Sequence, residues 1–353
     1  MAKILFVATD GGSYNALLPV VKFMSRKGHE TTWVTQSAGV AAGKINGGYV
    51  IENNEQSIKN ILIISNPDVV VSGVGSGRSD LCYHFSRTAL GLGIQVVKVL
   101  DFWGTGMPHE KGFAPTRLCV LDAESITYEA KMRGMRQEHI VATGAPQFDA
   151  LIDVSPLNIS KVDRPFIVFI GPASKERVDE ILLPLLELGK FLRAPISFGT
   201  LWHPRSKSET FVDNYAKIIH KMHNVHWIQD GPLRELGSGN ALLASADLVI
   251  GATSTELVKA CYLRRPTISF VPHNGVNHQL LLERGIDEMP TSACGATLHV
   301  GNQDSLNHLL RIFLKHGREW ESELRKMLSA QEAFYRLDGK NTQRVCDVIE
   351  SML

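Results

Sequence analysis

Apolar residues in this chain form short, continuous runs that alternate with longer stretches of helical spacing. The first run, KILFVA at residues 3–8, precedes a glycine-rich turn and a helical pattern that ends at Lys27-Gly28. Further strand-length runs occupy residues 31–35, 68–73, 94–100, 117–121 and 139–143. Apolar strands that alternate with helices are typical of a parallel sheet buried on both faces. The pattern therefore predicts an α/β fold for this part of the chain.

The alternation stops at a polar stretch with two prolines, DVSPLNISKVDRP at residues 153–165, and then begins again. The expected strands of this second series are residues 166–171, 195–204, 225–229, 248–252 and 266–271, and the expected helices are residues 175–192, 207–222, 233–245 and 255–263. Helical spacing resumes at Leu306 and continues to the end of the chain. We therefore expect two Rossmann-like domains, residues 1–155 and 156–325, followed by C-terminal helices, residues 326–353, of which the last is a candidate to cross back to the first domain.

The composition is that of an ordinary globular protein. The 353 residues are 44% hydrophobic and 21% charged, which is enough to bury a large core. Lys plus Arg number 37 against 36 Asp plus Glu, so no net charge attracts the chain to nucleic acid. The sequence shows neither a signal-peptide pattern nor an apolar run of membrane-spanning length. We expect a cytoplasmic protein without a nucleic-acid partner; peripheral membrane contact and the oligomeric state stay open.

The cysteines and histidines do not indicate a metal centre. Five cysteines, at positions 82, 119, 261, 294 and 346, lie far apart and form no CxxC pair, which favours reduced, mostly buried thiols. His273 and His278 are five residues apart in what the pattern predicts to be a loop, without a neighbouring cysteine or carboxylate. A metal site there is the weaker interpretation, so we expect neither a metal nor a cofactor.

The segment at residues 248–270 is the strongest candidate for a binding site. It predicts strand, polar turn, helix and strand, and the turn leaves Thr253, Ser254, Thr255 and Glu256 at a helix start. The first amide groups of a helix lack partners within the helix and carry the positive end of its dipole, so they can bind phosphate without a metal. The alternative is structural, because serine and threonine are also common N-caps. A phosphorylated ligand is the first hypothesis.

Several short motifs, together with the two predicted halves, resemble the two-domain GT-B glycosyltransferases. The motifs are Gly28-His29-Glu30 after the first helix, the basic turn His203-Pro204-Arg205 and the polar turn at residues 252–256. The segment VATGAPQFDALI at residues 141–152 is similar to the end of the first domain in a related group that includes the non-hydrolysing UDP-sugar 2-epimerases. The resemblance implies two Rossmann-like domains that face each other across a cleft, with a nucleotide sugar bound mainly to the second domain and an acceptor on the first.

The resemblance also implies roles for residues of the second domain. The Ser254-Thr255 turn would hold the donor phosphates, and Glu256 would lie near the ribose or the sugar. His203 and Arg205 follow a predicted strand, where a cation would neutralise a departing phosphate; a hydrogen-bonded loop residue and a solvated charge are the alternatives. Bacterial sialyltransferases of this fold use similar HisPro and SerThr motifs for a CMP-sugar, so the donor base stays open.

A loop that corresponds to PHNGVNHQ, residues 272–279, contacts donor hydroxyls in several transferases of this fold. By that resemblance His278 and Gln279 are candidates for sugar contacts, ahead of His273. The complete donor-binding set is His203, Arg205, Thr253, Ser254, Thr255, Glu256, His278 and Gln279.

The first domain contains the candidate base. Asp101 ends a predicted strand beside Phe102, where a carboxylate could take a proton from a sugar hydroxyl; capping of a loop is the competing role. Asp10 is the alternate base. It precedes Gly11 and Gly12 in a turn that lacks GxGxxG, so these glycines either let a ligand approach the helix start or simply form a tight turn.

A second glycine-rich turn follows the third predicted strand of this domain. Gly75, Ser76, Gly77 and Arg78 combine exposed backbone amides with a positive charge. They form a candidate acceptor or anion site, with a flexible loop as the alternative.

The chain departs from the epimerases at two places. Their first domain has a HisValGluAlaGlyLeuArg-like run that supplies carboxylates, where this chain has KVLDFWGTG at residues 98–106, and their SerGlyGly turn is replaced by AlaThrSerThr at residues 252–255. Epimerisation by elimination and readdition needs acid and base groups on the sugar itself, so these differences favour glycosyl transfer.

We therefore expect a metal-independent glycosyltransferase, inverting or retaining, that moves a sugar from a nucleotide-activated donor to a sugar, lipid-linked or small-molecule acceptor, as in polysaccharide biosynthesis. A UDP-sugar 2-epimerase-like isomerase is the first alternative. A non-catalytic protein that binds a nucleotide or a nucleotide sugar is the second.

Overall fold

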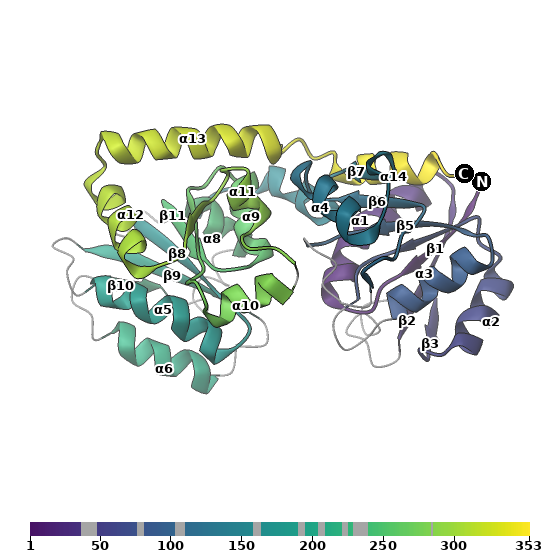
Figure 1. The fold of residues 1–353 in the computed structure, drawn as a ribbon, viewed down its shortest axis with the longest axis horizontal. Helices are drawn as coiled ribbons and strands as arrows, with labels where there is room; N and C mark the ends of the chain where they lie inside the picture. The colour runs from purple at the N-terminus through teal and green to yellow at the C-terminus, as the bar shows by residue number, and fades with distance from the viewer. Residues whose placement is uncertain are drawn as a thin grey trace. The chain divides into compact units, whose positions relative to one another are not determined.

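The chain folds into two compact units, each an α/β structure around one parallel sheet (Figure 1). The first unit is formed by Met1–Ala150 together with Asp338–Leu353, and the second by Leu151–Leu337. The computed structural model describes residues 1–36, 48–75, 81–102, 110–157, 164–189, 195–203, 209–220, 225–228, 239–283 and 285–353. The two Rossmann-like halves expected from the sequence are thus present.

The first unit is built on a seven-stranded sheet with the strand order β3-β2-β1-β4-β5-β6-β7. Its strands are β1 (Lys3–Val7), β2 (Glu30–Gln36), β3 (Tyr49–Ile51), β4 (Val69–Ser72), β5 (Gln95–Val99), β6 (Arg117–Val120) and β7 (Ile140–Ala142). Its helices are α1 (Gly11–Arg26), α2 (Glu55–Ser65), α3 (Leu81–Gly91), α4 (Glu124–Arg133) and α14 (Asn341–Glu350), with 3-10 turns η3 (Gln137–His139) and η4 (Pro146–Asp153), the latter running across the boundary between the units. All of its strand pairs in the described part of the chain are parallel.

Helices cover both faces of this sheet, which explains why its strands are continuous apolar runs. In β1, Ile4 and Phe6 face a cluster that includes residues of α1 and α14, whereas Leu5 and Val7 face residues of α2 and α3. A strand buried on both faces has no position at which a polar side chain reaches water.

The last helix of the chain, α14, completes the first unit. Val345, Cys346 and Ile349 are buried in the same cluster as α1 and β1 (Figure 1). The Asp149 carboxylate accepts hydrogen bonds from the backbone N–H groups of Asn341 and Thr342, at 2.8 and 2.7 Å. A carboxylate at a helix amino terminus satisfies free amides and complements the dipole. The preceding helix, α13 (Arg318–Phe334), belongs to the second unit, which extends to Leu337.

A chain of buried charges runs through the first unit. Lys98 Nζ lies 2.7 Å from Glu110 Oε1, and Arg133 Nη2 lies 3.0 Å from Glu110 Oε2. Arg133 Nε also donates to Glu129 Oε2 at 2.8 Å. All four side chains are at most 1% exposed. Two cations and two anions therefore balance one another inside the protein, where an unpaired charge would be costly.

The second unit is built on a six-stranded sheet with the strand order β10-β9-β8-β11-β12-β13, again parallel in all described pairs. Its strands are β8 (Phe166–Gly171), β9 (Ile196–Trp202), β10 (Val225–Ile228), β11 (Leu248–Gly251), β12 (Thr267–Phe270) and β13 (Leu298–Val300). Its helices are α5 (Lys175–Gly189), α6 (Glu209–Ile219), α8 (Gly239–Ser245), α9 (Thr255–Tyr262), α10 (Val276–Glu283), α11 (Pro290–Ala293), α12 (Gln303–Lys315) and α13.

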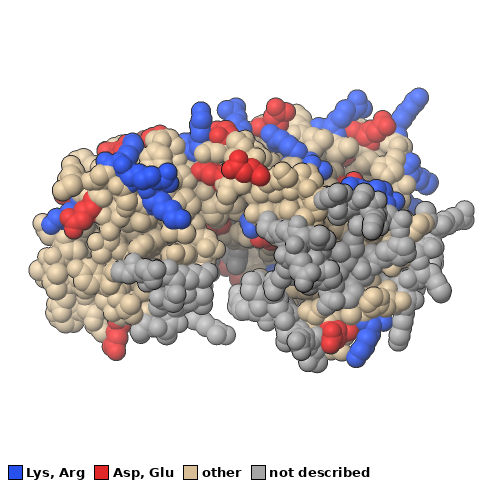
Figure 2. Space-filling model, turned by 180° about the vertical axis from the view of Figure 1, so that it is seen from behind, with Lys and Arg blue, Asp and Glu red and all other residues tan. Residues whose placement is uncertain are grey.

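The surface and the cysteines agree with the composition. Figure 2 shows acidic and basic side chains intermixed over the described part of one face. The cysteines are free thiols, and all except Cys294 are fully buried. None of the helices found in the described ranges is long and apolar enough to cross a membrane.

Candidate functional site

The carboxyl ends of β8 and β11 mark the point at which the strand order of the second sheet reverses. Strands β9 and β10 follow β8 on one side, and β12 and β13 follow β11 on the other. In an open parallel sheet the connections leaving two such strands diverge, and their carboxyl ends border a crevice where ligands bind. The residues that follow β8 and β11 are therefore the expected binding position of this unit.

Helix α9 begins at this position, with Ser254 as its N-cap. The Ser254 backbone is extended, and its Oγ accepts a hydrogen bond of 3.2 Å from the Glu256 N–H. The structural role considered from the sequence is thus present. It does not exclude anion binding, because a helix starts with four amides that lack intrahelical partners and this cap satisfies one of them. Thr253 and Thr255 flank the cap and are half-buried.

Arg177, which the sequence reasoning missed, fixes a positive charge beside this turn. It lies in the first turn of α5, directly after β8. Its Nη2 donates to Thr253 Oγ1 and its Nε donates to Asn277 Oδ1, both at 2.8 Å. Asn277, at the start of α10, is fully buried. Guanidinium and helix dipole both favour an anion at this position. The sequence did contain a signal for Arg177, a cation shortly after a predicted strand. The same signal identified Arg205 as a candidate.

A carboxylate closes the amino terminus of the neighbouring helix α10. Glu180 accepts hydrogen bonds from the backbone N–H groups of Val276 and Asn277, at 2.7 and 2.9 Å. A Cβ at Gly275 would lie 1.7 Å from Glu180 Oε1 and 2.9 Å from Pro272 O, so a side chain there would displace the carboxylate. Since α10 already has a negative partner, a ligand anion is favoured at α9 instead.

The structure corrects one feature of the predicted sugar-contacting loop. Residues 272–279 are not all loop, because α10 begins at Val276 and carries both His278 and Gln279 in its first turns. The local pattern is weakly amphipathic, and the helix is stabilised by Glu180, which is far away in the sequence. His278 Nδ1 accepts a 3.2 Å hydrogen bond from the Asn274 N–H.

Three histidine rings gather near the start of α10. The His273 ring lies 5.7 Å from the His278 ring and 6.3 Å from the His299 ring, measured between centroids. Burial lowers the pKa of His299, Glu288 opposes this shift, and the two neighbouring imidazoles add to it. His299 is therefore uncharged at neutral pH. No group of three His, Cys, Asp or Glu residues that could hold a metal ion occurs in the ranges the structure describes.

The structure shows the contacts of two further residues that the sequence predicts to bind the donor sugar nucleotide. The His203 backbone N–H donates to Gly171 O at 3.2 Å, which places His203 beside the end of β8. Glu256 Oε1 forms an ion pair of 2.7 Å with Lys259 within α9. Arg205 lies outside the described residues, as do Ser76, Gly77 and Arg78 of the glycine-rich turn in the first unit. Gly75 is the last described residue before that gap.

In the first unit, both candidate bases border Gly12. A Cβ at Gly12 would lie 2.2 Å from Asp101 Oδ2 and 3.5 Å from Asp10 Oδ1. Asp10 is the N-cap of α1, where its Oδ1 accepts from the Ser13 N–H and from Ser13 Oγ, both at 2.8 Å. Asp10 thus has a structural role as the cap of α1.

This pair of carboxylates lies where the strand order of the first sheet reverses. Strands β1 and β4 are neighbours at that point. The residue after β4, Gly73, has room for no side chain, because a Cβ there would lie 2.5 Å from Ser13 Cβ. The start of α1 therefore packs directly on the carboxyl end of β4, at the ligand-binding position of an open parallel sheet.

A buried thiol close to the same edge is not a nucleophile. Cys82 Sγ lies 3.8 Å from Thr9 Oγ1, and burial raises the pKa of the thiol to about 12. A thiol with so high a pKa stays protonated at neutral pH, and the thiolate is the reactive form. At this edge of the sheet the carboxylates of Asp10 and Asp101, rather than the Cys82 thiol, are therefore the candidates for chemistry.

Comparisons with known proteins establish the fold. No protein-family model matches the sequence, and no curated protein matches it. A solved structure of a protein assigned as a UDP-N-acetylglucosamine 2-epimerase, from Listeria monocytogenes, is similar, with 14% identity, a TM-score of 0.69, and coverage of 99% of this chain and 96% of that one.

Two further solved structures are similar over the same length. The UDP-GlcNAc 2-epimerase from Neisseria meningitidis, solved with bound UDP-GlcNAc, shows 14% identity and a TM-score of 0.66, with 99% of this chain and 100% of that one covered. MurG from Acinetobacter baumannii gives 14% identity, a TM-score of 0.66 and coverage of 99% and 100%. This chain therefore has the two-domain GT-B fold that UDP-sugar 2-epimerases and MurG share, as the sequence resemblance implied.

Proposed function

We propose that this chain is a GT-B enzyme that binds a nucleotide-activated sugar, with a UDP-sugar as the first candidate. The observation that carries the proposal is the Arg177 guanidinium held beside the start of α9, at the reversal point of the second sheet. A fixed cation and helix amides together suit the phosphates of a nucleoside diphosphate. The Neisseria meningitidis structure, which shares the fold, contains UDP-GlcNAc, and this supports uridine as the base.

The residues of the second unit then divide into three roles. Ser254, Thr255 and Arg177 would hold the phosphates, together with Arg205. His203 would lie beside them at the end of β8, and Glu256 would contact the ribose or the sugar. His278 and Gln279, on the first turns of α10, are the proposed contacts for sugar hydroxyls.

We propose glycosyl transfer as the reaction. Asp101, with Asp10 as the alternate, takes the proton from an acceptor hydroxyl, whose oxygen forms a bond to the anomeric carbon of the donor sugar. The bond from that carbon to the diphosphate oxygen breaks, and its electron pair leaves with the phosphate, where Arg177 and the amides of α9 stabilise the charge. Because protein groups would stabilise the leaving group, we expect turnover in the presence of EDTA.

A thermal-shift screen against UDP, CMP, GDP and dTDP tests the binding step. A ligand that binds only the folded state raises the melting temperature in proportion to its occupancy. We expect a shift with UDP, and the selective response would identify the donor base. If none of the four nucleotides changes the melting temperature at millimolar concentration, the proposed phosphate site is wrong.

A UDP-sugar 2-epimerase activity is the second candidate, because several of the similar solved structures carry that name. Incubation with UDP-GlcNAc separates the two reactions. An epimerised UDP-sugar formed without any acceptor would identify an epimerase, whereas product that requires an acceptor and releases UDP would identify a transferase.

The third alternative is a protein that binds the nucleotide sugar without turning it over. Asp101→Asn distinguishes it from an enzyme, since the substitution removes the base and keeps the size of the side chain. Turnover lost with UDP binding kept supports an enzyme, and unchanged turnover would remove Asp101 from the mechanism.

A further inference from the structure

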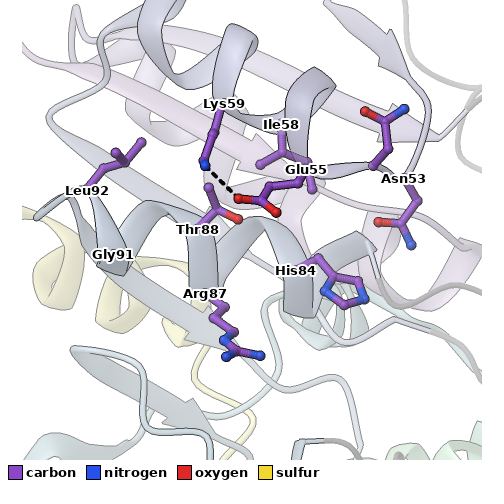
Figure 3. Close-up of a pocket in the computed structure, with 10 residues that line it drawn as sticks. Asn53, Glu55, Ile58, Lys59, His84, Arg87, Thr88, Gly91 and Leu92 are labelled. Carbon is purple, nitrogen blue, oxygen red and sulfur yellow. Dashed lines mark ion pairs between the residues drawn. The ribbon is translucent and has the colours of Figure 1, made fainter.

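A groove of about 620 Å³ lies on the first unit between the amino-terminal turns of α2 and one side of α3 (Figure 3). Its volume is that of a small-ligand site, which typically measures about 300–1,000 Å³. None of the residues that line it belongs to the proposed nucleotide-sugar site or to the carboxylate pair at Gly12. The groove is therefore a candidate for a separate binding site.

The charges along the groove leave a positive excess. Lys59 and Arg87 are the lysine and arginine of the lining, and Glu55 is its acidic residue. Lys59 Nζ lies 2.5 Å from Glu55 Oε1, and its hydrogen bond lowers the pKa of that carboxyl. Arg87, on the α3 side, forms no ion pair with any residue in the described part of the chain. Among the described residues, one guanidinium charge at the groove thus has no carboxylate partner.

The uncharged residues that line the groove indicate a ligand larger than a single ion. Thr88 projects between the two helices toward Glu55 and Lys59, and Asn53 lies at the amino-terminal end of α2 (Figure 3). Ile58 and Leu92 add apolar surface. A hydroxyl, an amide and aliphatic carbon on the same walls suit a ligand that presents hydroxyl groups on a carbon ring.

We propose that this groove binds a small anionic saccharide, a sugar that carries a phosphate or a carboxylate. Its charged group lies beside Arg87, and its hydroxyl groups reach Thr88 and Asn53. Arg suits both anions, since its planar fork pairs with carboxylate and with phosphate oxygens. The site lies wholly in the first unit and does not depend on the nucleotide-sugar proposal.

Titration calorimetry with glucose 6-phosphate, glucuronate and uncharged glucose tests this site. We expect at least one of the two anionic sugars to bind at least tenfold more tightly than glucose, and the better of the two identifies the anion. Binding of neither at millimolar concentration, or equal binding of all three, would overturn the proposal.

Two substitutions with opposite effects locate the binding. Arg87→Gln should weaken binding of the preferred anionic sugar by about tenfold, the effect of losing one hydrogen bond to a charged group. Glu55→Gln removes the acidic charge and releases Lys59, so it should strengthen binding severalfold. Both side chains are exposed, so neither change removes core packing.

The matched control is Lys22→Gln, which removes an exposed cation from α1. It should leave the affinity for the anionic sugar unchanged. An equal loss in Arg87→Gln and Lys22→Gln would show a general charge effect and contradict a site in the groove. The UDP-induced thermal shift should be the same in all three variants, which separates this test from that of the nucleotide site.

Discussion

Gly12 leaves room for the Asp101 carboxylate, because a Cβ there would lie 2.2 Å from Asp101 Oδ2. We predict that Gly12→Ala displaces the Asp101 carboxylate and lowers turnover at least tenfold. Alanine is a better helix former than glycine, so the fold should be kept. Steady-state kinetics gives the turnover, and calorimetry should show UDP affinity unchanged.

Gly11→Ala is the matched control for this prediction. An added Cβ at Gly11 meets no atom within 4 Å. Its effect on turnover should therefore be much smaller than that of Gly12→Ala. Equal losses in the two variants would mean that the contact with Asp101 is not the cause.

Arg177 connects the α9 turn with α10 through two hydrogen bonds of 2.8 Å. We predict that Arg177→Ala weakens UDP binding by about tenfold or more, about 1.4 kcal/mol. It should also lower the free energy of unfolding by about 1–3 kcal/mol, because the buried Asn277 amide oxygen loses its donor. Calorimetry and urea unfolding measure the two effects.

Arg177→Lys and Arg318→Ala complete this experiment. The lysine keeps the charge but loses the planar fork, so its affinity should lie between those of the wild type and the alanine variant. Arg318 is an exposed arginine of the same unit and should have no effect on UDP binding. UDP affinity that is the same in all variants would exclude Arg177 from the phosphate site.

The sequence identified the side chains whose chemistry is local and missed those whose role depends on tertiary contacts. Ser254 stands out because a strand, a polar turn and a helix follow one another within a few residues. Arg177, Glu180 and Asn277 meet only when α5 and α10 pack together, and no local pattern predicts that packing. The sequence predicts both Asp10 and Asp101 as bases, but that both carboxylates border Gly12 is visible only in the folded unit.

The start of helix α10 depends on a carboxylate from helix α5. A Cβ at Gly275 would lie 1.7 Å from Glu180 Oε1, far inside van der Waals contact. We predict that Gly275→Ala separates Glu180 from the α10 amides and destabilises the second unit by about 1–3 kcal/mol. Thermal unfolding measures the change.

Gly239→Ala serves as the control for helix α8 of the same unit. The nearest atom to an added Cβ there is Leu201 Cδ2, at 3.4 Å, which is an ordinary contact. Its melting temperature should stay close to that of the wild type. If Gly275→Ala is equally harmless, Glu180 does not determine where α10 begins.

The buried charges join β5, α4 and the segment at Glu110. Burial alone would raise the pKa of Glu110, but Lys98 and Arg133 outweigh it and hold that pKa below its ordinary value. A carboxyl whose pKa is lower in the folded than in the unfolded protein stabilises the fold fully at pH values above its unfolded pKa, about 4.3. This stabilisation is lost as the pH falls through the pKa of the folded protein. The first unit should therefore lose stability in acid below about pH 4.3.

Unfolding of the wild type and Glu110→Gln at a series of pH values tests this dependence. Glu110→Gln should be less stable at pH 7 by about 3–5 kcal/mol, because buried Lys98 loses its carboxylate partner and buried Arg133 keeps only Glu129. Its stability should also vary less with pH in the acid range. Parallel pH profiles for the two proteins would contradict the assignment to Glu110.

Helices and strands were predictable where a periodic pattern was long enough. In the described ranges, the pattern did not predict strands β3 and β13, which have three residues each and lie at the edges of their sheets. Such short strands exist because a neighbouring strand offers hydrogen bonds, which the local sequence does not show. For the same reason the sequence predicts a loop where α10 lies, since the carboxylate that caps α10 belongs to α5.

For the chain as a whole, the first unit needs both ends of the sequence. Deletion of residues 338–353 removes α14 and exposes the side of the core that contains Ile4 and Phe6. We predict that the deletion lowers the melting temperature of the first unit by more than 10 °C, since burial of one large apolar side chain contributes about 1.5–3 kcal/mol and α14 buries several. The second unit should melt as before.

Calorimetry of the full-length and shortened proteins, with UDP added in parallel runs, checks this prediction. The UDP-stabilised transition should be kept in the shortened protein, because the proposed phosphate site lies in Leu151–Leu337. Simultaneous loss of both transitions would show that the two units do not unfold separately.

The restart of the strand and helix pattern after residue 165 was enough to predict two Rossmann-like halves. It was not enough to choose a reaction. Transfer and epimerisation differ in where a few acid and base groups stand relative to a bound sugar, and the GT-B fold is common to proteins named for different reactions.

The helix that closes the first unit also sets an order of events at the ribosome. Leu151–Leu337 lies between the two segments of that unit, so it is synthesised complete before Asp338–Leu353 leaves the exit tunnel. The first unit, whose synthesis starts first, is therefore the last to have all of its residues available for folding. Until then the apolar surface that packs against Val345 and Ile349 in the folded unit lacks this cover on the nascent chain, and exposed apolar surface of this kind favours aggregation.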